Sequence, residues 1–132
     1  MDNLWPEFDD IEKAVTPGTI LREQARALGL KFRQRIEGEV RIERYEKVFS
    51  CTFLITSKPL SYSYELFKVE YGLFEIYPAA IILEGDLAEE IACDKEEIVK
   101  CDDEAAFIDT VKKIFVSKKT QKIIKGLSQH LS

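Results

Sequence analysis

The chain has 132 residues, 45% of them hydrophobic and 33% charged, and its formal net charge is −5. This length suits one domain with one hydrophobic core, and the hydrophobic share argues against disorder. An acidic chain lacks the basic surface that nucleic-acid binding requires, and no apolar run approaches the roughly 20 residues of a membrane-spanning helix. We therefore expect a single domain, residues 1–132, that binds neither nucleic acid nor membrane and resides in the cytoplasm.

The N-terminal segment, residues 1–16, is predicted to be an acidic arm or a short helix. Its apolar residues recur every three or four positions, as on one face of a helix, and Trp5 is expected to pack the segment against the body. Thr16 followed by Pro17 is typical of a helix start, with a capping side chain and then a proline in the first turn. A helix over 17–29 follows, and Gly29 is expected just past its end.

Residues 31–84 are predicted to form a four-stranded antiparallel meander, because the hydrophobic period changes there from 3.6 to 2. In the first strand, charged residues alternate with Phe32, Ile36, Val40 and Ile42, and Gly38 could mark a bulge or a bend. The third strand changes phase between Leu66 and Phe67, which predicts a bulge. The fourth is expected over 73–84, at an edge or bulged, because Pro78 cannot donate to a ladder.

Residues 85–102 are predicted to be an acidic, mostly loop region, with room for a short helix over 87–92 and a short strand over 97–101. Residues 84–104 carry ten acids and two lysines, whereas residues 105–132 carry six lysines and one aspartate. A helix pair over 103–131 follows. Asp102 or Asp103 is expected to cap its first helix, and Ser117 to end that helix and start the second. Five residues of the pair should be buried: Phe107, Val111, Phe115, Ile124 and Leu127.

Catalytic and cofactor motifs are missing from the sequence. The sole histidine is His130, third from the C-terminus, so the usual imidazole base and histidine zinc ligands are lacking. Neither a phosphate-binding glycine loop nor an EF-hand pattern occurs. Cys51, Cys93 and Cys101 give an odd count without metal-ligand spacing, which favours reduced thiols over a disulfide framework, although a bridge between Cys93 and Cys101 stays open. We therefore expect no catalytic residues, no metal and no cofactor, and we lean against an enzyme.

The candidate partner-binding residues come from the acidic region and from the third strand. A concentration of one charge sign raises the association rate with a protein of opposite charge, and exposed tyrosines bury large area at low entropic cost. The residues that we expect to contact a partner are Glu89, Glu90, Asp94, Glu96, Glu97, Tyr62 and Tyr64.

The fold expected from these patterns is α+β, with an N-terminal helix, the meander and two C-terminal helices on one face of the sheet. The expected function is non-enzymatic binding of another protein with a basic surface, in its most concrete form an immunity-type inhibitor of a basic toxin or nuclease. The alternative is a small-ligand-binding or enzymatic domain whose pocket lies between the sheet and the helices. The oligomeric state does not follow from the sequence.

Overall fold

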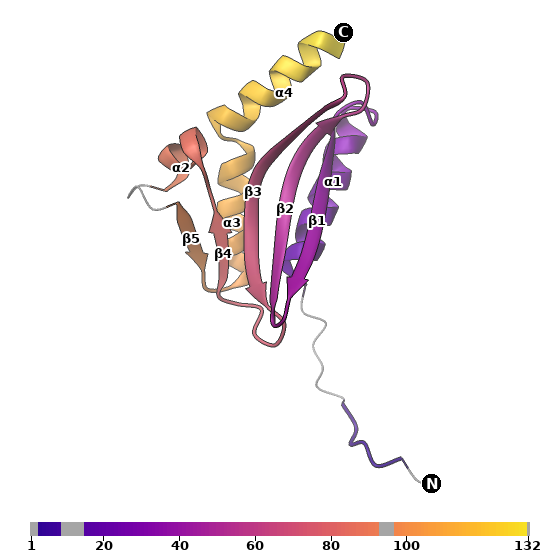
Figure 1. The fold of residues 1–132 in the computed structure, drawn as a ribbon, viewed down its shortest axis with the longest axis vertical. Coiled ribbons are helices and arrows are strands. Elements are labelled where there is room, and N and C mark those ends of the chain that lie inside the picture. The colour runs from indigo at the N-terminus through magenta and orange to yellow at the C-terminus, as the bar shows by residue number, and fades with distance from the viewer. Residues whose placement is uncertain (1–2, 9–14, 93–96, 132) are drawn as a thin grey trace.

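The computed structural model describes residues 3–8, 15–92 and 97–131. It confirms the α+β class and the element types at both ends, with a five-stranded sheet instead of four strands (Figure 1). The elements are α1 (Pro17–Lys31), β1 (Glu37–Tyr45), β2 (Val48–Ser57), β3 (Tyr62–Gly72), β4 (Ala79–Ile82), α2 (Gly85–Ile91), β5 (Ile98–Cys101), α3 (Glu104–Phe115) and α4 (Lys118–Leu131).

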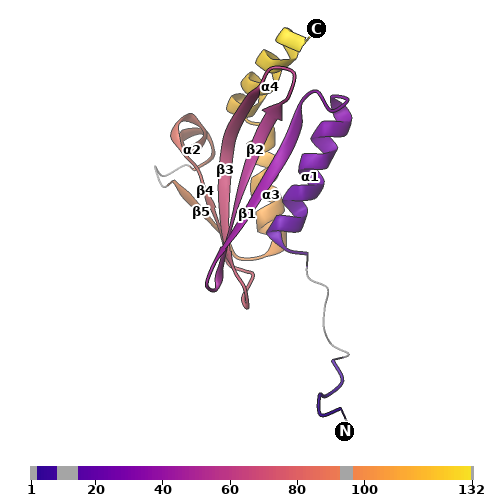
Figure 2. The same cartoon turned by 45° about the vertical axis from the view of Figure 1, so that its right-hand side comes forward.

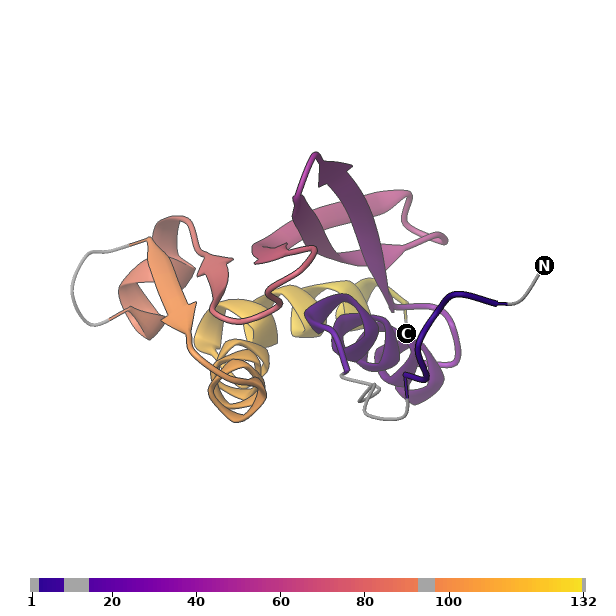
Figure 3. The same ribbon diagram turned by 90° about the horizontal axis from the view of Figure 1, so that it is seen from below.

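The sheet is antiparallel throughout, in the order β1-β2-β3-β4-β5. Helices α1, α3 and α4 lie on one side of it, as the view from below shows (Figure 3). The fifth strand is β5, which the sequence allowed as a short strand in the acidic region. It pairs with β4 and therefore places β4 inside the sheet and not at an edge.

The fourth strand is shorter than predicted, because residues 73–78 form a loop. This loop returns so closely that a Cβ on Gly72 would lie 2.4 Å from the Glu75 carbonyl oxygen, a distance that only glycine permits. Pro78 follows a cis peptide bond and lies just before β4. Because Pro78 lies outside the strand, its missing N–H does not interrupt the hydrogen bonds of the sheet, and β4 need not be an edge strand.

Helix α1 starts as predicted and ends later than predicted. The Thr16 side chain accepts a hydrogen bond from the Thr19 N–H, 3.2 Å away. At the other end the helix continues through Gly29 to Lys31, so Gly29 lies within it, and Arg33 and Gln34 take the left-handed backbone conformation after it. The chain between this helix end and Glu37 is consequently a turn, not the first part of β1.

Gly38 does not mark a bulge, because β1 and β2 keep regular register through the Gly38–Ile55 pair. A Cβ on Gly38 would lie 2.5 Å from the Ala25 Cα in α1 and 3.0 Å from the Phe53 ring. The glycine therefore allows the backbone of α1 to approach β1 closely (Figure 2).

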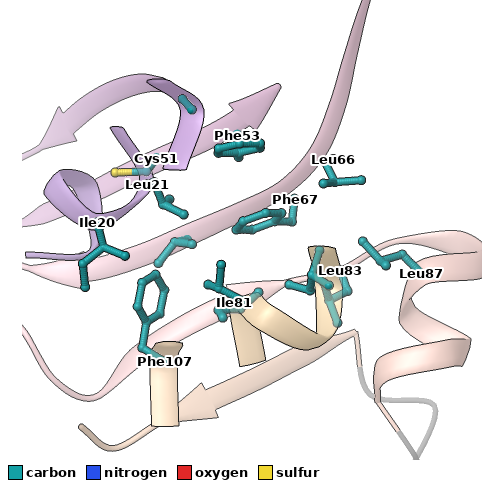
Figure 4. Close-up of a cluster of buried hydrophobic side chains, with 14 of the residues drawn as sticks. Ile20, Leu21, Cys51, Phe53, Leu66, Phe67, Ile81, Leu83, Leu87 and Phe107 are labelled. Carbon is teal, nitrogen blue, oxygen red and sulfur yellow. The ribbon is translucent and has the colours of Figure 1, made fainter. Parts of the chain in front are cut away.

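The predicted bulge in β3 is confirmed. Phe53 pairs with Phe67 and the next residue, Leu54, pairs with Glu65, so that Leu66 is the extra residue on β3. Leu66 and Phe67 are consecutive and yet both buried in the core (Figure 4). The bulge thus lets one strand supply two adjacent side chains to the hydrophobic cluster that the helices cover.

The C-terminal helices are capped as predicted, and their inward residues are buried to different degrees. Asp103 accepts a hydrogen bond from the Ala106 N–H at 2.8 Å, and Ser117 accepts one from the Thr120 N–H at 3.2 Å. Phe107, Val111 and Leu127 are buried. Phe115 and Ile124 are only partly buried.

The N-terminal segment does not pack on the body in the residues that the structure describes. Residues 3–8 have no regular structure, and Trp5 is 75% exposed. The predicted packing of Trp5 is therefore wrong. The remainder of the helix that the spacing suggested falls mostly on residues 9–14, which lie outside the described part of the chain.

The first prediction concerns the core. Phe107 is fully buried, so Phe107→Ala should lower the free energy of unfolding by about 3–5 kcal/mol. Phe74 is 79% exposed, so Phe74→Ala should change it by less than about 0.5 kcal/mol. Urea denaturation of both variants measures the difference. Equal midpoints would show that Phe107 is not in the core.

Candidate functional site

An apolar groove with a volume of about 410 Å³ lies between α1 and α4. Its floor is β2, and the end of α3 closes one part of it. The groove is lined by Gln24, Ala27, Leu28, Lys31, Phe32, Phe53, Ile55, Phe115, Thr120 and Ile124. Seven of these ten side chains are apolar, and the ionisable one is Lys31. We call this hollow the α1–α4 groove.

The floor of the α1–α4 groove rests on three aromatic rings. The Phe53 ring stacks on Phe67 across the strands, with 5.5 Å between the ring centroids. Phe115 leans over both, with its centroid 5.3 Å from Phe53 and 6.3 Å from Phe67. These distances fall within the favourable range for offset or tilted aromatic pairs. The floor is therefore fixed by core packing, while Phe115 keeps one side toward the groove.

The walls follow from helical periodicity. Leu28 and Lys31 lie one turn apart on α1, and Thr120 and Ile124 lie one turn apart on α4. Thr120 is buried, and its hydroxyl donates a hydrogen bond to the Ile114 carbonyl oxygen at 2.7 Å, so it is already paired within the chain. The polar side chains left to meet an occupant are Gln24 and Lys31.

A smaller hollow of about 170 Å³ adjoins the groove and shares Phe32 with it. Its lining is Phe32, Arg35, Ile36, Ser128 and Leu131. On α4 the two linings run from Thr120 to Leu131, which at 1.5 Å per residue is about 16 Å. The two hollows together form an elongated apolar surface whose ionisable groups are Lys31 and Arg35. The lysines of α4 do not line this surface, and three of them, Lys118, Lys122 and Lys125, line a separate hollow.

Part of the acidic region makes contacts within the molecule. The Glu90 carboxylate accepts the Lys118 N–H at 2.9 and 3.0 Å, and so caps the start of α4. Asp86 lies 3.9 Å from the Lys119 ammonium group. Glu89 and Glu97 are exposed, on α2 and just before β5. Of the other candidate partner-binding residues, Asp94 and Glu96 lie outside the described residues.

The two candidate tyrosines have different surroundings. Tyr62 is 40% exposed at the start of β3. Tyr64 is partly buried, and the Lys119 Nζ lies 5.6 Å from its ring centroid, a cation–π contact. Because Lys119 also pairs with Asp86, the structure connects Tyr64 with α2. It does not gather all the candidate residues into one surface.

Cys51, Cys101 and Tyr77 have pKa values above their ordinary ones. Burial raises the pKa of the Cys51 thiol and of the Cys101 thiol, and both thiols are free. Burial, with the nearby Glu104 carboxylate, raises the pKa of Tyr77 to about 12. A reactive cysteine needs a lowered pKa, so these two thiols are suited to packing and not to attack. Cys93 lies outside the described residues.

Comparison with models of known protein families, with curated proteins and with solved structures found no match. Within residues 3–8, 15–92 and 97–131, no group of three His, Cys, Asp or Glu side chains is placed to hold a metal ion. The helices of these same ranges are too short or too polar to cross a membrane. The functional argument therefore depends on the geometry of the surfaces.

The sequence did not identify the α1–α4 groove. Its periodicity predicted Phe115 and Ile124 as inward-facing, which is the same signal that core residues give. Whether an inward side chain meets another helix or an open groove depends on the separation of α1 and α4. No local pattern encodes that separation, so these residues were expected in the core and not in a site.

The second prediction tests the structural role of Glu90. Glu90→Ala removes the carboxylate that caps α4 and should lower the free energy of unfolding by about 1 kcal/mol. Glu89→Ala, its exposed neighbour, should change it by less than about 0.5 kcal/mol. Chemical denaturation of the two variants gives the comparison. If the two variants lose equal stability, Glu90 is not a cap in solution.

Proposed function

We propose that the protein is a non-enzymatic binding protein, and that the α1–α4 groove receives an apolar, acidic segment of a partner protein. The observation that carries the proposal is the groove itself, an apolar hollow of about 410 Å³ between two helices with Lys31 at its wall. Such a volume falls in the range of binding pockets, and a lone cation among apolar side chains selects an anionic partner with apolar side chains.

The shape of the groove favours a polypeptide segment over a small molecule. Pockets for small molecules usually enclose most of the ligand surface, whereas this hollow lies open between α1 and α4. Its continuation past Phe32 gives a path of about 16 Å along α4. About three turns of an amphipathic helix cover that length, which is a common mode of peptide recognition.

The chemistry of the lining supports binding over catalysis. The described residues around the groove supply no carboxylate, imidazole or thiol to it. A general acid or base must lie within hydrogen-bond reach of the reacting atoms. An enzymatic pocket, the alternative drawn from the sequence, would need inward glutamate, arginine or tyrosine side chains, and the α1–α4 groove has none among its lining residues.

The acidic region is a second candidate surface, because Glu89 and Glu97 are exposed on α2 and just before β5. These two elements lie together at one edge of the sheet (Figure 1). A basic protein, for example a toxin or nuclease bound by an immunity-type inhibitor, would be attracted there. The internal roles of Glu90 and Asp86 reduce the charge that this surface can offer, so we rank it below the groove.

The third prediction separates the two surfaces. Peptides selected from a random 12-residue display library on the full-length protein should be acidic and apolar, if the groove is the site. Ala27 is an exposed groove residue, and Ala27→Glu should weaken these peptides at least tenfold by filling the groove and repelling acids. Ala105→Glu, at an exposed position of α3, is the matched control and should leave their affinity unchanged.

A different set of selected peptides would favour the acidic region as the binding surface. Basic peptides that keep their affinity for Ala27→Glu and lose it on Glu89→Lys with Glu97→Lys would favour the acidic surface and overturn the groove. Titration with the anionic apolar dye 8-anilinonaphthalene-1-sulfonate checks the groove without a peptide. Dye fluorescence should rise with the wild type and with Ala105→Glu, and much less with Ala27→Glu.

A further inference from the structure

The N-terminal arm, residues 3–8, exposes three large apolar side chains. Leu4, Trp5 and Phe8 are 86%, 75% and 57% exposed, and the Trp5 and Phe8 ring centroids lie 6.4 Å apart. Exposed apolar side chains gathered on one short segment usually mark an interaction site. The arm therefore offers an apolar, aromatic face that the body of the same molecule does not cover.

The charge of the arm is opposite to that of the groove. Residues 3–8 carry one acid, Glu7, and no base, and residues 1–16 together carry five acids and one lysine. The groove and its continuation carry Lys31 and Arg35, and no acid is among their lining residues. An acidic segment with aromatic side chains is the chemistry that the groove selects. The arm thus matches the proposed ligand in both apolar character and charge sign.

The arm and the groove lie at different ends of the molecule. The arm projects from the N-terminal end of α1, away from the sheet (Figures 1 and 2). The groove begins seven residues into α1, at Gln24, and continues past its C-terminal end to Arg35. In this arrangement the arm of one molecule points away from its own groove and is available to the groove of another.

We propose that residues 3–8 of a second copy of this chain occupy the α1–α4 groove, with Trp5 as the anchoring side chain. Exchange of two arms gives a closed two-fold dimer, in which each copy contributes Trp5 to the site of the other. This proposal rests on the proposed function, since it names an occupant of the same groove. The arm then competes with the partner segment, which binds the groove by displacing it.

The fourth prediction uses Trp5 as a reporter, because it is the only tryptophan in the chain. Tryptophan emission shifts to shorter wavelength when the indole leaves water. Emission of the full-length protein should shift to longer wavelength on dilution, together with a change from dimer to monomer in sedimentation velocity. Ala27→Glu should abolish both the dimer and the blue-shifted emission, whereas Ala105→Glu should preserve them. Lys31→Glu should weaken the dimer at least fivefold.

Mixing two variants isolates the contact between copies. Ala27→Glu keeps the arm and blocks the groove, and Trp5→Ala keeps the groove and removes the anchor. Neither variant alone should show blue-shifted tryptophan emission. Adding the tryptophan-free Trp5→Ala chain to Ala27→Glu should shift the emission of the latter to shorter wavelength, because its arm then enters an open groove. The same mixture made with a Trp5→Ala chain that also carries Ala27→Glu should show no shift.

Two outcomes would overturn the inference. Blue-shifted emission that does not depend on concentration, without a shift on mixing, would mean that the arm binds its own molecule. Emission typical of exposed tryptophan at all concentrations, with a monomer throughout, would mean that the groove does not take the arm. In either case, acidic peptides that bind the wild type and lose affinity on Ala27→Glu would still support the groove as the site for a partner protein. If Ala27→Glu changes neither the tryptophan emission nor the affinity for the peptides, the groove is not a binding site.

Discussion

The close contact between α1 and β1 is the constraint on which the rest of the structure depends. Gly38 has no side chain where the Ala25 Cα approaches, and a Cβ there would lie 2.5 Å from it. Because α1 comes so near to β1, it sits toward that edge of the sheet and leaves part of β2 uncovered by helix. Phe53 and Ile55 therefore form the floor of a groove, and α4 forms its other wall. A residue larger than glycine at position 38 would move α1 and change the groove as well as the core.

The bulge at Leu66 lets two consecutive residues of β3 pack in the core. An uninterrupted strand would point alternate side chains of β3 to opposite faces, so Leu66 and Phe67 could not both face the helices. The extra residue puts both in the core, where Phe67 contacts Phe53 and Phe115. The aromatic contact joins β2, β3 and the end of α3, and it holds the floor of the groove while Phe115 remains partly exposed.

The acidic and basic residues are separated along the chain, and some of them stabilise the fold while others remain available for binding. Glu90 caps α4 and Asp86 pairs with Lys119, so part of the acidic region stabilises the basic helix next to it. Lys31 and Arg35 make the groove side of the molecule positive, whereas Lys118, Lys122 and Lys125 line a separate hollow on α4. The acids of residues 1–16 are then complementary to that side, which is why charge and apolar character point to the same occupant.

The sequence by itself determined the α+β class, the helix caps at Thr16, at Asp102 or Asp103 and at Ser117, and the bulge in β3. Each is set by neighbouring residues: a capping side chain meets an N–H two or three positions on, and a bulge reverses the alternation of side chains within one strand. Such short-range rules can be read without knowing what lies beyond the element.

The tertiary structure alone decided the features that depend on distance between elements. Gly38 indicated a bulge or bend because the approach of Ala25 cannot be seen in a strand pattern, and β4 became an interior strand because β5 pairs with it. Phe115 and Ile124 gave the same inward-facing signal as Phe107, yet only Phe107 is fully buried. Hydrophobic periodicity fixes which face of a helix turns inward, whereas the separation of two helices is fixed by packing, and that separation makes the difference between a core and a groove.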